Sequence, residues 1–335
     1  MRNRRLQTRV TTGHFTLPVT IFLSISIWIG TAFLLPSITI ERSGCFLCDL
    51  LVGLKISGGL ESVLSFFLYA TIGYLLIELN NIYAMIRMRA SVQTAVYFML
   101  ISICPAMHYL YVGNIASVAL LISLFFLFRG YQYSRSAAAL FYSFLFIALG
   151  SLFFPQLMFF IPVFWIGAYN IQSLTLKSFM ASLIGWSVPY WFLLGHAYFY
   201  NEMDLFYQPF ISLATFGSMD LLACPLWELA TFGYLAILFL VSSIHCLVSS
   251  YDDKIRTRIY LRFLIFLDFC FFAYFLLQPS LGIQLLPLLL IGTSILIGHL
   301  FVLTNSRTSN VFFIAVLLGL LTLFSFNVWT LLYNF

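Results

Sequence analysis

The chain has 335 residues, of which 62% are hydrophobic and 8% charged, whereas soluble domains have roughly 45–50% apolar and about 25% charged residues. So few charges cannot hydrate the surface of a soluble particle, which excludes a soluble enzyme, a disordered chain and a nucleic-acid-binding arm. The apolar runs are continuous and about twenty residues long, as a helix that crosses ~30 Å of hydrocarbon requires, and they lack the alternation of a transmembrane barrel. We therefore expect an all-α, polytopic transmembrane helical bundle.

Apolar runs separated by polar or Pro/Gly clusters predict about eleven spans. Ten or twelve are alternatives, because the runs within 92–128 and within 137–171 are joined by very short connections. The predicted spans are 15–36, 62–79, 92–111, 113–128, 137–153, 156–171, 179–196, 226–247, 261–277, 282–303 and 311–332. The first run lacks a small-x-small cleavage site, so it is interpreted as a retained span. Residues 1–335 then form a single integral membrane domain with no soluble domain.

The positions of the basic residues predict the orientation of the chain. If the N-terminus is cytoplasmic, fourteen of the sixteen basic residues lie in inner segments, and only Arg42 and Lys55 lie outside. Because basic residues concentrate in cytoplasmic loops, we expect a multi-pass membrane protein with its N-terminus inside and its C-terminus outside. The outer loops are then 37–61 and 197–225. The fourteen inner residues are Arg2, Arg4, Arg5, Arg9, Arg87, Arg89, Arg129, Arg135, Lys177, Lys254, Arg256, Arg258, Arg262 and Arg307.

Asp268 is the most unusual ionisable residue, because it lies near the middle of the apolar run LRFLIFLDFCFFAYFLL. Charged side chains are costly inside a membrane, and a buried carboxylate either finds a partner or takes up a proton. Arg262, His299 and His245 lie at comparable predicted depths. Asp268 is therefore either satisfied by a neighbouring hydroxyl or histidine, or part of a proton or substrate relay.

The predicted outer surface concentrates the acidic residues. They either provide a general base or hold a divalent cation, or they simply keep the loops hydrated. Cys45 and Cys48 form a CxxC pair, for which a disulfide, free thiols, redox chemistry and metal binding all remain open. No nucleotide-binding glycine pattern, lipase elbow or HExxH pair is present, so the cofactor and any metal stay unknown. The acids are Glu41, Asp49, Glu61, Glu202, Asp204, Asp220 and Glu228.

Two basic clusters lie on the predicted inner side, IRMR with Arg87 and Arg89, and KIRTRIYLR beginning at Lys254. Each lysine or arginine near a membrane surface contributes ~1 kcal/mol to the free energy of binding to anionic lipid. These clusters either hold lipid head groups or a lipid phosphate, or they serve only to orient the chain. Membrane lipids are thus the expected partners, and nothing in the pattern predicts a nucleic acid.

The region from about residue 66 to residue 192 contains LLIELNNIYAMIRMRAS, LFFLFRGYQ and ALGSLFFPQLMFFIPVFWIGAYNIQSLTLKSFMASLIGWSVPYWF. It resembles an uncharacterised family of multi-span inner-membrane proteins of Bacteroides- and Flavobacterium-type bacteria. More loosely, the chain is similar to C-type membrane glycosyltransferases and polysaccharide polymerases, which carry an acid on the first outer loop. That similarity implies Asp49, or in second place Glu61, as the catalytic base.

Three functions remain open from the sequence. The first is an enzyme of cell-envelope glycan or lipid-linked sugar assembly, which holds a lipid-linked substrate between its spans. The second is a non-catalytic subunit of a membrane assembly, with a partner membrane protein. The third is a transporter or flippase that uses Asp268 as its coupling site.

Overall fold

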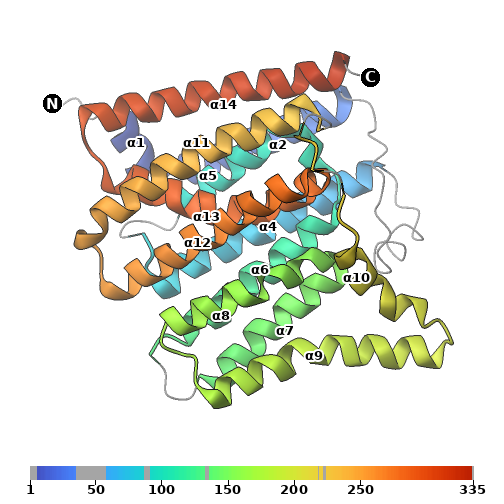
Figure 1. Cartoon of the computed structure of the whole chain (residues 1–335). Coiled ribbons are helices and arrows are strands. Elements are labelled where there is room, and N and C mark those ends of the chain that lie inside the picture. The colour runs from blue at the N-terminus through green and yellow to red at the C-terminus, as the bar shows by residue number, and fades with distance from the viewer. Residues whose placement is uncertain are drawn as a thin grey trace.

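The computed structural model describes residues 6–34, 58–86, 91–132, 136–217, 219–221 and 224–333. Every regular element in these ranges is a helix, and most helices lie side by side along one direction (Figure 1). The α-helices are α1 (Leu6–Thr12), α2 (Thr16–Leu34), α4 (Gly58–Tyr83), α5 (Ser91–Ser102), α6 (Val112–Arg129), α7 (Ala137–Phe153), α8 (Ile161–Asn170), α9 (Leu176–Phe199), α10 (Asp204–Ala214), α11 (Leu226–Val248), α12 (Ile255–Leu277), α13 (Gly282–Leu303) and α14 (Arg307–Tyr333). Short 3-10 helices are η1 (Pro105–His108), η2 (Pro155–Phe160), η4 (Ser249–Asp252) and η5 (Pro279–Leu281).

The multi-span helical class is confirmed, but the expectation of eleven spans is wrong. Seven helices in the described residues are long and apolar enough to cross a membrane. They cover Thr16–Phe33, Gly59–Tyr83, Val112–Arg129, Leu226–Tyr251, Ile255–Leu277, Pro279–Leu303 and Arg307–Tyr333.

Proline accounts for two of the four runs that do not form a full span. The run 92–111 forms α5, which ends at Ser102, and Pro105 then opens the 3-10 helix η1. The run 156–171 is divided between η2, which begins at Pro155, and the ten-residue helix α8. Because proline lacks a backbone N–H and clashes with the preceding turn, neither run continues as one long α-helix.

The other two runs form helices whose length or composition falls short. The run 137–153 becomes α7, an apolar helix of 17 residues. The run 179–196 lies inside α9, which has 24 residues but is less apolar than the seven spans. The sequence predicted both runs as spans because apolar residues were counted without knowledge of where each helix begins and ends.

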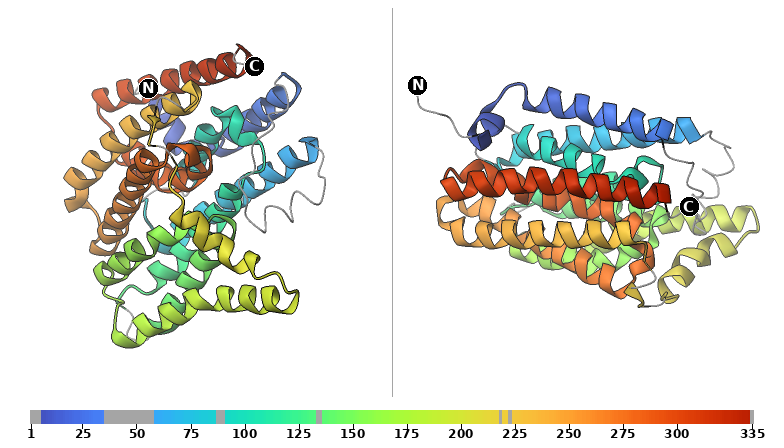
Figure 2. Two further views of the ribbon diagram at one scale, coloured as in Figure 1. Left: turned by 45° about the vertical axis from the view of Figure 1, so that its right-hand side comes forward. Right: turned by 90° about the horizontal axis from the view of Figure 1, so that it is seen from above.

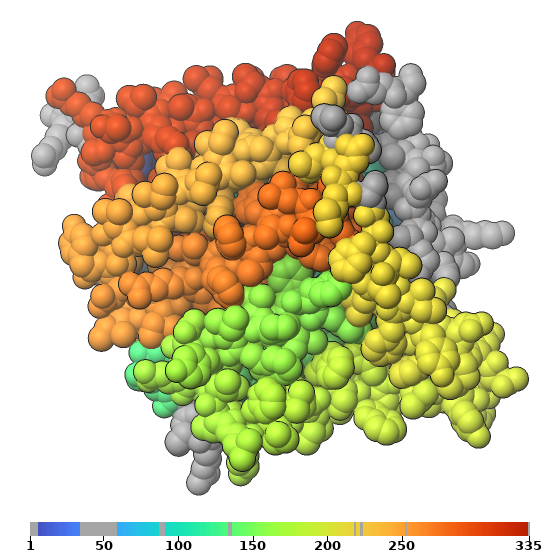
Figure 3. Space-filling model, viewed as in Figure 1, coloured from blue at the N-terminus to red at the C-terminus, as the bar shows by residue number. Residues whose placement is uncertain are grey.

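Helix α13 forms the axis of the bundle. It packs against α5, α6, α11 and α12, and 94% of its span is buried. The spans of α2, α4 and α14 are only 22–28% buried, so most of their apolar side chains contact lipid. Figure 3 shows α11 and α12 side by side on one face of the molecule. Polar groups that contact α13 are therefore removed from both lipid and water.

The first and last helices start at the same end of the bundle. The side-chain amide of Gln7 donates to the carbonyls of Phe301 (2.8 Å) and Thr304 (2.9 Å), which ties α1 to the end of α13. Helix α14 then runs the length of the molecule, so Tyr333 lies at the opposite end (Figures 1 and 2).

All lysines and arginines in the described residues lie at the end of the bundle where α14 begins, which we call the basic end. Helices α4, α6 and α13 finish there, and α12 starts there. Basic loops on one side are typical of a membrane protein, but the side that faces the cytoplasm stays a prediction. The residues are Arg9, Arg129, Lys177, Lys254, Arg256, Arg258, Arg262 and Arg307.

The first part of α9 packs along α7, and its later part projects together with α10 from one corner of the bundle (Figures 1 and 2). A capping box starts α9, in which the Thr175 hydroxyl accepts the Ser178 backbone N–H while the Ser178 hydroxyl accepts that of Thr175. The predicted outer loop 197–225 thus contains a helix, α10, in the described part of the chain. Of the other predicted loop, residues 37–57 lie outside the described residues.

Candidate functional site

Asp268 occupies the centre of the bundle. It lies about 20 Å along α12 from Ile255, at 1.5 Å per residue, and it is 0% exposed. Neither carboxyl oxygen has a hydrogen-bond partner. The carboxyl contacts Gly292 in the middle of α13, where an added Cβ would overlap it. The glycine therefore provides the space that the acidic side chain fills.

The two histidines expected near Asp268 are paired elsewhere, and Arg262 lies six residues before it on α12, or about 9 Å along the helix. Nε2 of His299 lies 2.9 Å from Oδ2 of Asp253, and both side chains are buried. Nε2 of His245 lies 3.1 Å from the hydroxyl of Ser249. Although Gly292 and His299 share a face of α13, seven residues separate them by about 10 Å. The structure thus confirms that Asp268 is buried, but it does not bring the predicted partners to it.

Glu228 is a second buried acid that contacts α13. It lies in the first turn of α11, is 6% exposed, and fills the space beside Gly282 at the start of α13. The backbone N–H of Ile283 faces its carboxylate. A negative charge at a helix N-terminus is favoured by the helix dipole, so Glu228 caps α13. The sequence analysis grouped Glu228 with the acids of the outer loops, because the position of a residue next to a loop does not show how deeply its side chain is buried.

Buried polar side chains support the irregular turn between α5 and α6. The side-chain amide of Asn327 on α14 donates to the carbonyl of Ile103 at 2.8 Å. The hydroxyl of Ser65 on α4 donates to the carbonyl of Tyr109 at 3.0 Å. Buried backbone carbonyls must find a donor within the protein, so these side chains have a structural role that the sequence analysis missed.

His108 lies in this same turn, outside the membrane-spanning helices. Its ring stacks on Trp28 at 3.8 Å between centroids, and its Nδ1 lies 2.7 Å from the hydroxyl of Thr31. Burial lowers the pKa of His108 to about 3. The histidine is therefore neutral at physiological pH and belongs to the packed turn.

At the basic end, three tyrosines surround the guanidinium of Arg256. Its central carbon lies 5.2 Å from the ring centroid of Tyr83, 5.4 Å from that of Tyr260 and 5.9 Å from that of Tyr131. Its Nε donates to the hydroxyl of Tyr260 at 2.8 Å. Cation–π contacts of this kind hold an arginine in place while leaving it exposed to solvent. The basic cluster was noted in the sequence, but the tyrosines come from three separate segments and were missed.

Arg256 opens onto a groove between α4 and α6 with a volume of about 640 Å³. This is within the range of ligand sites, roughly 300–1,000 Å³. Arg129, at the end of α6, also lines it, as does Glu78 one turn and a half before the end of α4. The remaining lining is apolar or aromatic, namely Tyr74, Leu75, Ile82, Tyr83, Ile122, Phe125 and Phe126. The groove thus joins an apolar floor to two cationic side chains.

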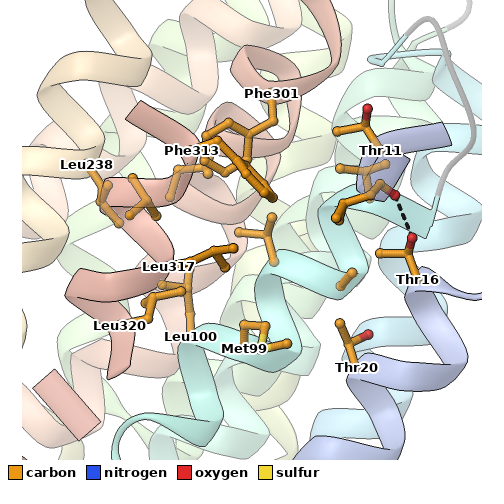
Figure 4. A pocket seen from close by; sticks show the side chains of 16 residues that line it. Thr11, Thr16, Thr20, Met99, Leu100, Leu238, Phe301, Phe313, Leu317 and Leu320 are labelled. Atoms are coloured by element: carbon orange, nitrogen blue, oxygen red, sulfur yellow. Dashed lines mark hydrogen bonds between the residues drawn. The ribbon is translucent and has the colours of Figure 1, made fainter. Parts of the chain in front are cut away.

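A second cavity lies between α2, α5 and α14 (Figure 4). Its volume is about 70 Å³, and its walls are formed by side chains such as Met99, Leu100, Phe313 and Leu320. Drug-sized ligands need several times that volume. The cavity is therefore a small apolar gap between helices.

The residues nominated for catalysis and metal binding are not brought together in the described part of the chain. Asp49, Cys45 and Cys48 lie outside the described residues. Glu61 is half-buried in the first turn of α4, at the end opposite to Arg256. Among the described residues, no three His, Cys, Asp or Glu side chains gather as metal ligands would.

The comparisons with known proteins add no family to these observations. No protein-family model, no curated protein and no solved structure matches the chain. Fold and composition define the class: a multi-pass, α-helical membrane protein whose surface contacts lipid.

Proposed function

We propose that this protein binds a phosphate-bearing lipid in the groove between α4 and α6 and handles it in the assembly of cell-envelope glycans. The observation that carries the proposal is the convergence of Arg129 and Arg256 at the polar end of an apolar groove. Arginine recognises phosphate through several N–H donors, and the apolar floor suits a hydrocarbon chain.

The geometry of the groove agrees with such a ligand. The lining residues of α4 extend from Tyr74 to Tyr83, or about 13 Å at 1.5 Å per residue. The arginines lie at the basic end, where a lipid head group is found when the chain spans a bilayer. With basic loops on the cytoplasmic side, the phosphate would be held at the inner face of the bacterial cytoplasmic membrane.

The position of Glu78 in the groove supports a lipid whose phosphate carries a sugar. Its carboxylate accepts hydrogen bonds only, so it cannot bind the phosphate itself. It lines the groove together with Tyr74 and Tyr83. A hydroxyl-rich head group attached to the phosphate would supply donors to Glu78 and a flat face to the tyrosine rings. A lipid-linked sugar therefore suits the groove better than a simple anionic phospholipid.

The transfer of such a sugar would also need a general base. Glu61, which the sequence nominated for this role, lies 13 residues before Tyr74, the nearest lining residue of α4, or about 20 Å away. It does not reach the groove, and Glu78, which does line it, is assigned to binding the sugar. The groove supports the binding of a lipid-linked substrate, and a non-catalytic subunit that presents this lipid to a partner enzyme would use the same contacts.

Native mass spectrometry of the full chain tests the proposal. A polyprenyl monophosphate should bind, whereas the polyprenol of equal length should not. At ~1 kcal/mol per charge, Arg256→Gln and Arg129→Gln should each weaken binding roughly fivefold. Arg307→Gln is the matched control, because Arg307 begins α14 at the same end but does not line the groove. Equal binding of the polyprenol, or an equal loss with Arg307→Gln, would contradict the proposal.

The role of Glu78 is tested with a second probe. Glu78→Gln should weaken binding of a polyprenyl phosphosugar while leaving that of the monophosphate unchanged. Parallel losses for both lipids would show that Glu78 does not contact a sugar.

A further inference from the structure

The surroundings of Asp268 do not suit an ionised carboxylate. Its side chain is 0% exposed and neither oxygen accepts a hydrogen bond. An isolated charge inside a protein is very costly unless it is paired or hydrogen-bonded, and a neutral acid avoids most of this cost. Its position midway along α12 and α13 removes it from both membrane surfaces.

The helices that pack on α12 offer Asp268 no counter-charge. Helices α8, α11 and α13 and the 3-10 helix η5 pack against α12, and aromatic rings of α4, α6 and η2 also contact it. Their ionisable side chains lie elsewhere: His299 pairs with Asp253, His245 contacts Ser249, and Glu228 caps α13. Tyr169 on α8 is largely exposed, and Arg262 lies six residues before Asp268 on α12 itself. No described basic side chain therefore bonds to the Asp268 carboxyl.

Gly292 allows a close contact between α12 and α13 at this position. The Asp268 carboxyl lies directly against the backbone of α13 at Gly292. Any side chain larger than that of glycine at position 292 would overlap the carboxyl. If this contact served packing alone, an alanine and a leucine could form it. An acid would then be unfavourable, because its removal from water costs stability. The pairing of an acid with a glycine instead allows the acid to gain water when α12 and α13 move apart.

We infer that Asp268 is a proton-binding site that holds a proton while α12 and α13 are in contact and releases it when they separate. On release, the O–H bond breaks, the proton passes to water, and the carboxylate remains on α12. On closure the carboxylate takes up a proton again. Such a cycle is the coupling step of a proton-linked transporter or flippase. It is independent of lipid binding in the groove, because Asp268 and the groove share no residue.

Infrared spectroscopy of the full chain in lipid vesicles tests the inference. The difference spectrum between the native protein and Asp268→Asn should show the carbonyl band of a protonated carboxylic acid at neutral pH. Transfer to D₂O should shift that band as the acid exchanges its proton. Asp204→Asn is the matched control, because Asp204 is exposed on α10 and should contribute carboxylate bands.

Each result decides the inference. Carboxylate bands in the Asp268 difference spectrum would overturn it, and an acid band that never shifts in D₂O would show a static structural acid. If Asp268→Asn does not fold, Asp268→Glu moves the carboxyl by one methylene and should displace the same band. Arg256→Gln should leave the band unchanged, and Asp268→Asn should leave lipid binding unchanged, so this inference and the proposed lipid site fail separately.

Discussion

The contact between Asp268 and Gly292 predicts a strong energetic coupling between α12 and α13. For a Cβ added at Gly292, the three nearest atoms are all in the Asp268 carboxyl group. Gly292→Ala should therefore overpack this one contact. Overpacking typically costs 1–3 kcal/mol, offset by up to ~1 kcal/mol from the higher helix propensity of alanine.

The coupling is measured by combining the two substitutions. In an Asp268→Ala background the carboxyl is gone, so Gly292→Ala should cost nothing or stabilise by up to ~1 kcal/mol. The interaction energy of the double-mutant cycle should then be roughly 1–3 kcal/mol. The assay is the free energy of unfolding of purified protein in mixed micelles, titrated with a denaturing detergent.

Gly30 provides a control for the effect of alanine itself. It lies in α2, and a Cβ added there meets nothing within 4 Å. Gly30→Ala should therefore be neutral or slightly stabilising in both backgrounds. If Gly292→Ala costs the same with and without the Asp268 carboxyl, the two residues are not in contact and the reasoning about a proton site at this interface loses its basis.

Three further outcomes follow from the structure. Asn327→Ala leaves the buried carbonyl of Ile103 unpaired and should destabilise the protein by ~1–3 kcal/mol in the same detergent titration, whereas an unchanged stability would mean that the turn finds another donor. Because the pKa of His108 is lowered, the unfolded chain binds more protons than the native protein between about pH 3 and 6.5, so the free energy of unfolding should fall as the pH drops through this range. His108→Asn should flatten this pH dependence, and an equally steep curve for the variant would refute the assignment of a neutral, buried His108. In intact cells, an impermeant thiol reagent should modify a cysteine placed at 204 but not one at 254, because the ends are expected on opposite membrane sides; the reverse pattern would invert the topology.

The class of the protein and its most unusual residue were accessible from the sequence. A helix that crosses hydrocarbon needs a long apolar run, and this requirement is local in the chain. The concentration of basic residues in alternate loops is equally local, and the structure gathers those it describes at one end of the bundle. Asp268 stood out because one acid in an apolar run is visible without knowledge of any neighbour.

The number of spans could not be read in the same way. The runs 92–111 and 156–171 are apolar because they are packed inside the bundle, and burial in protein requires the same composition as contact with lipid. Pro105 and Pro155 signalled breaks, yet proline is also tolerated inside α13, where Pro287 is buried within a continuous helix. Only the packing of each helix decides between these outcomes.

The partners of the site residues were decided by tertiary structure alone. The sequence placed His299 at a depth comparable to that of Asp268, but the alignment of α12 on α13 sets Asp268 against Gly292, about 10 Å along α13 from His299, which pairs with Asp253. The groove at Arg256 likewise depends on α4, α6 and α12 finishing or starting at one level. Composition and charge determine which segments enter the membrane and how they are oriented, and both can be read from the local sequence. Specific contacts depend on how helices distant in the sequence are rotated and aligned against one another.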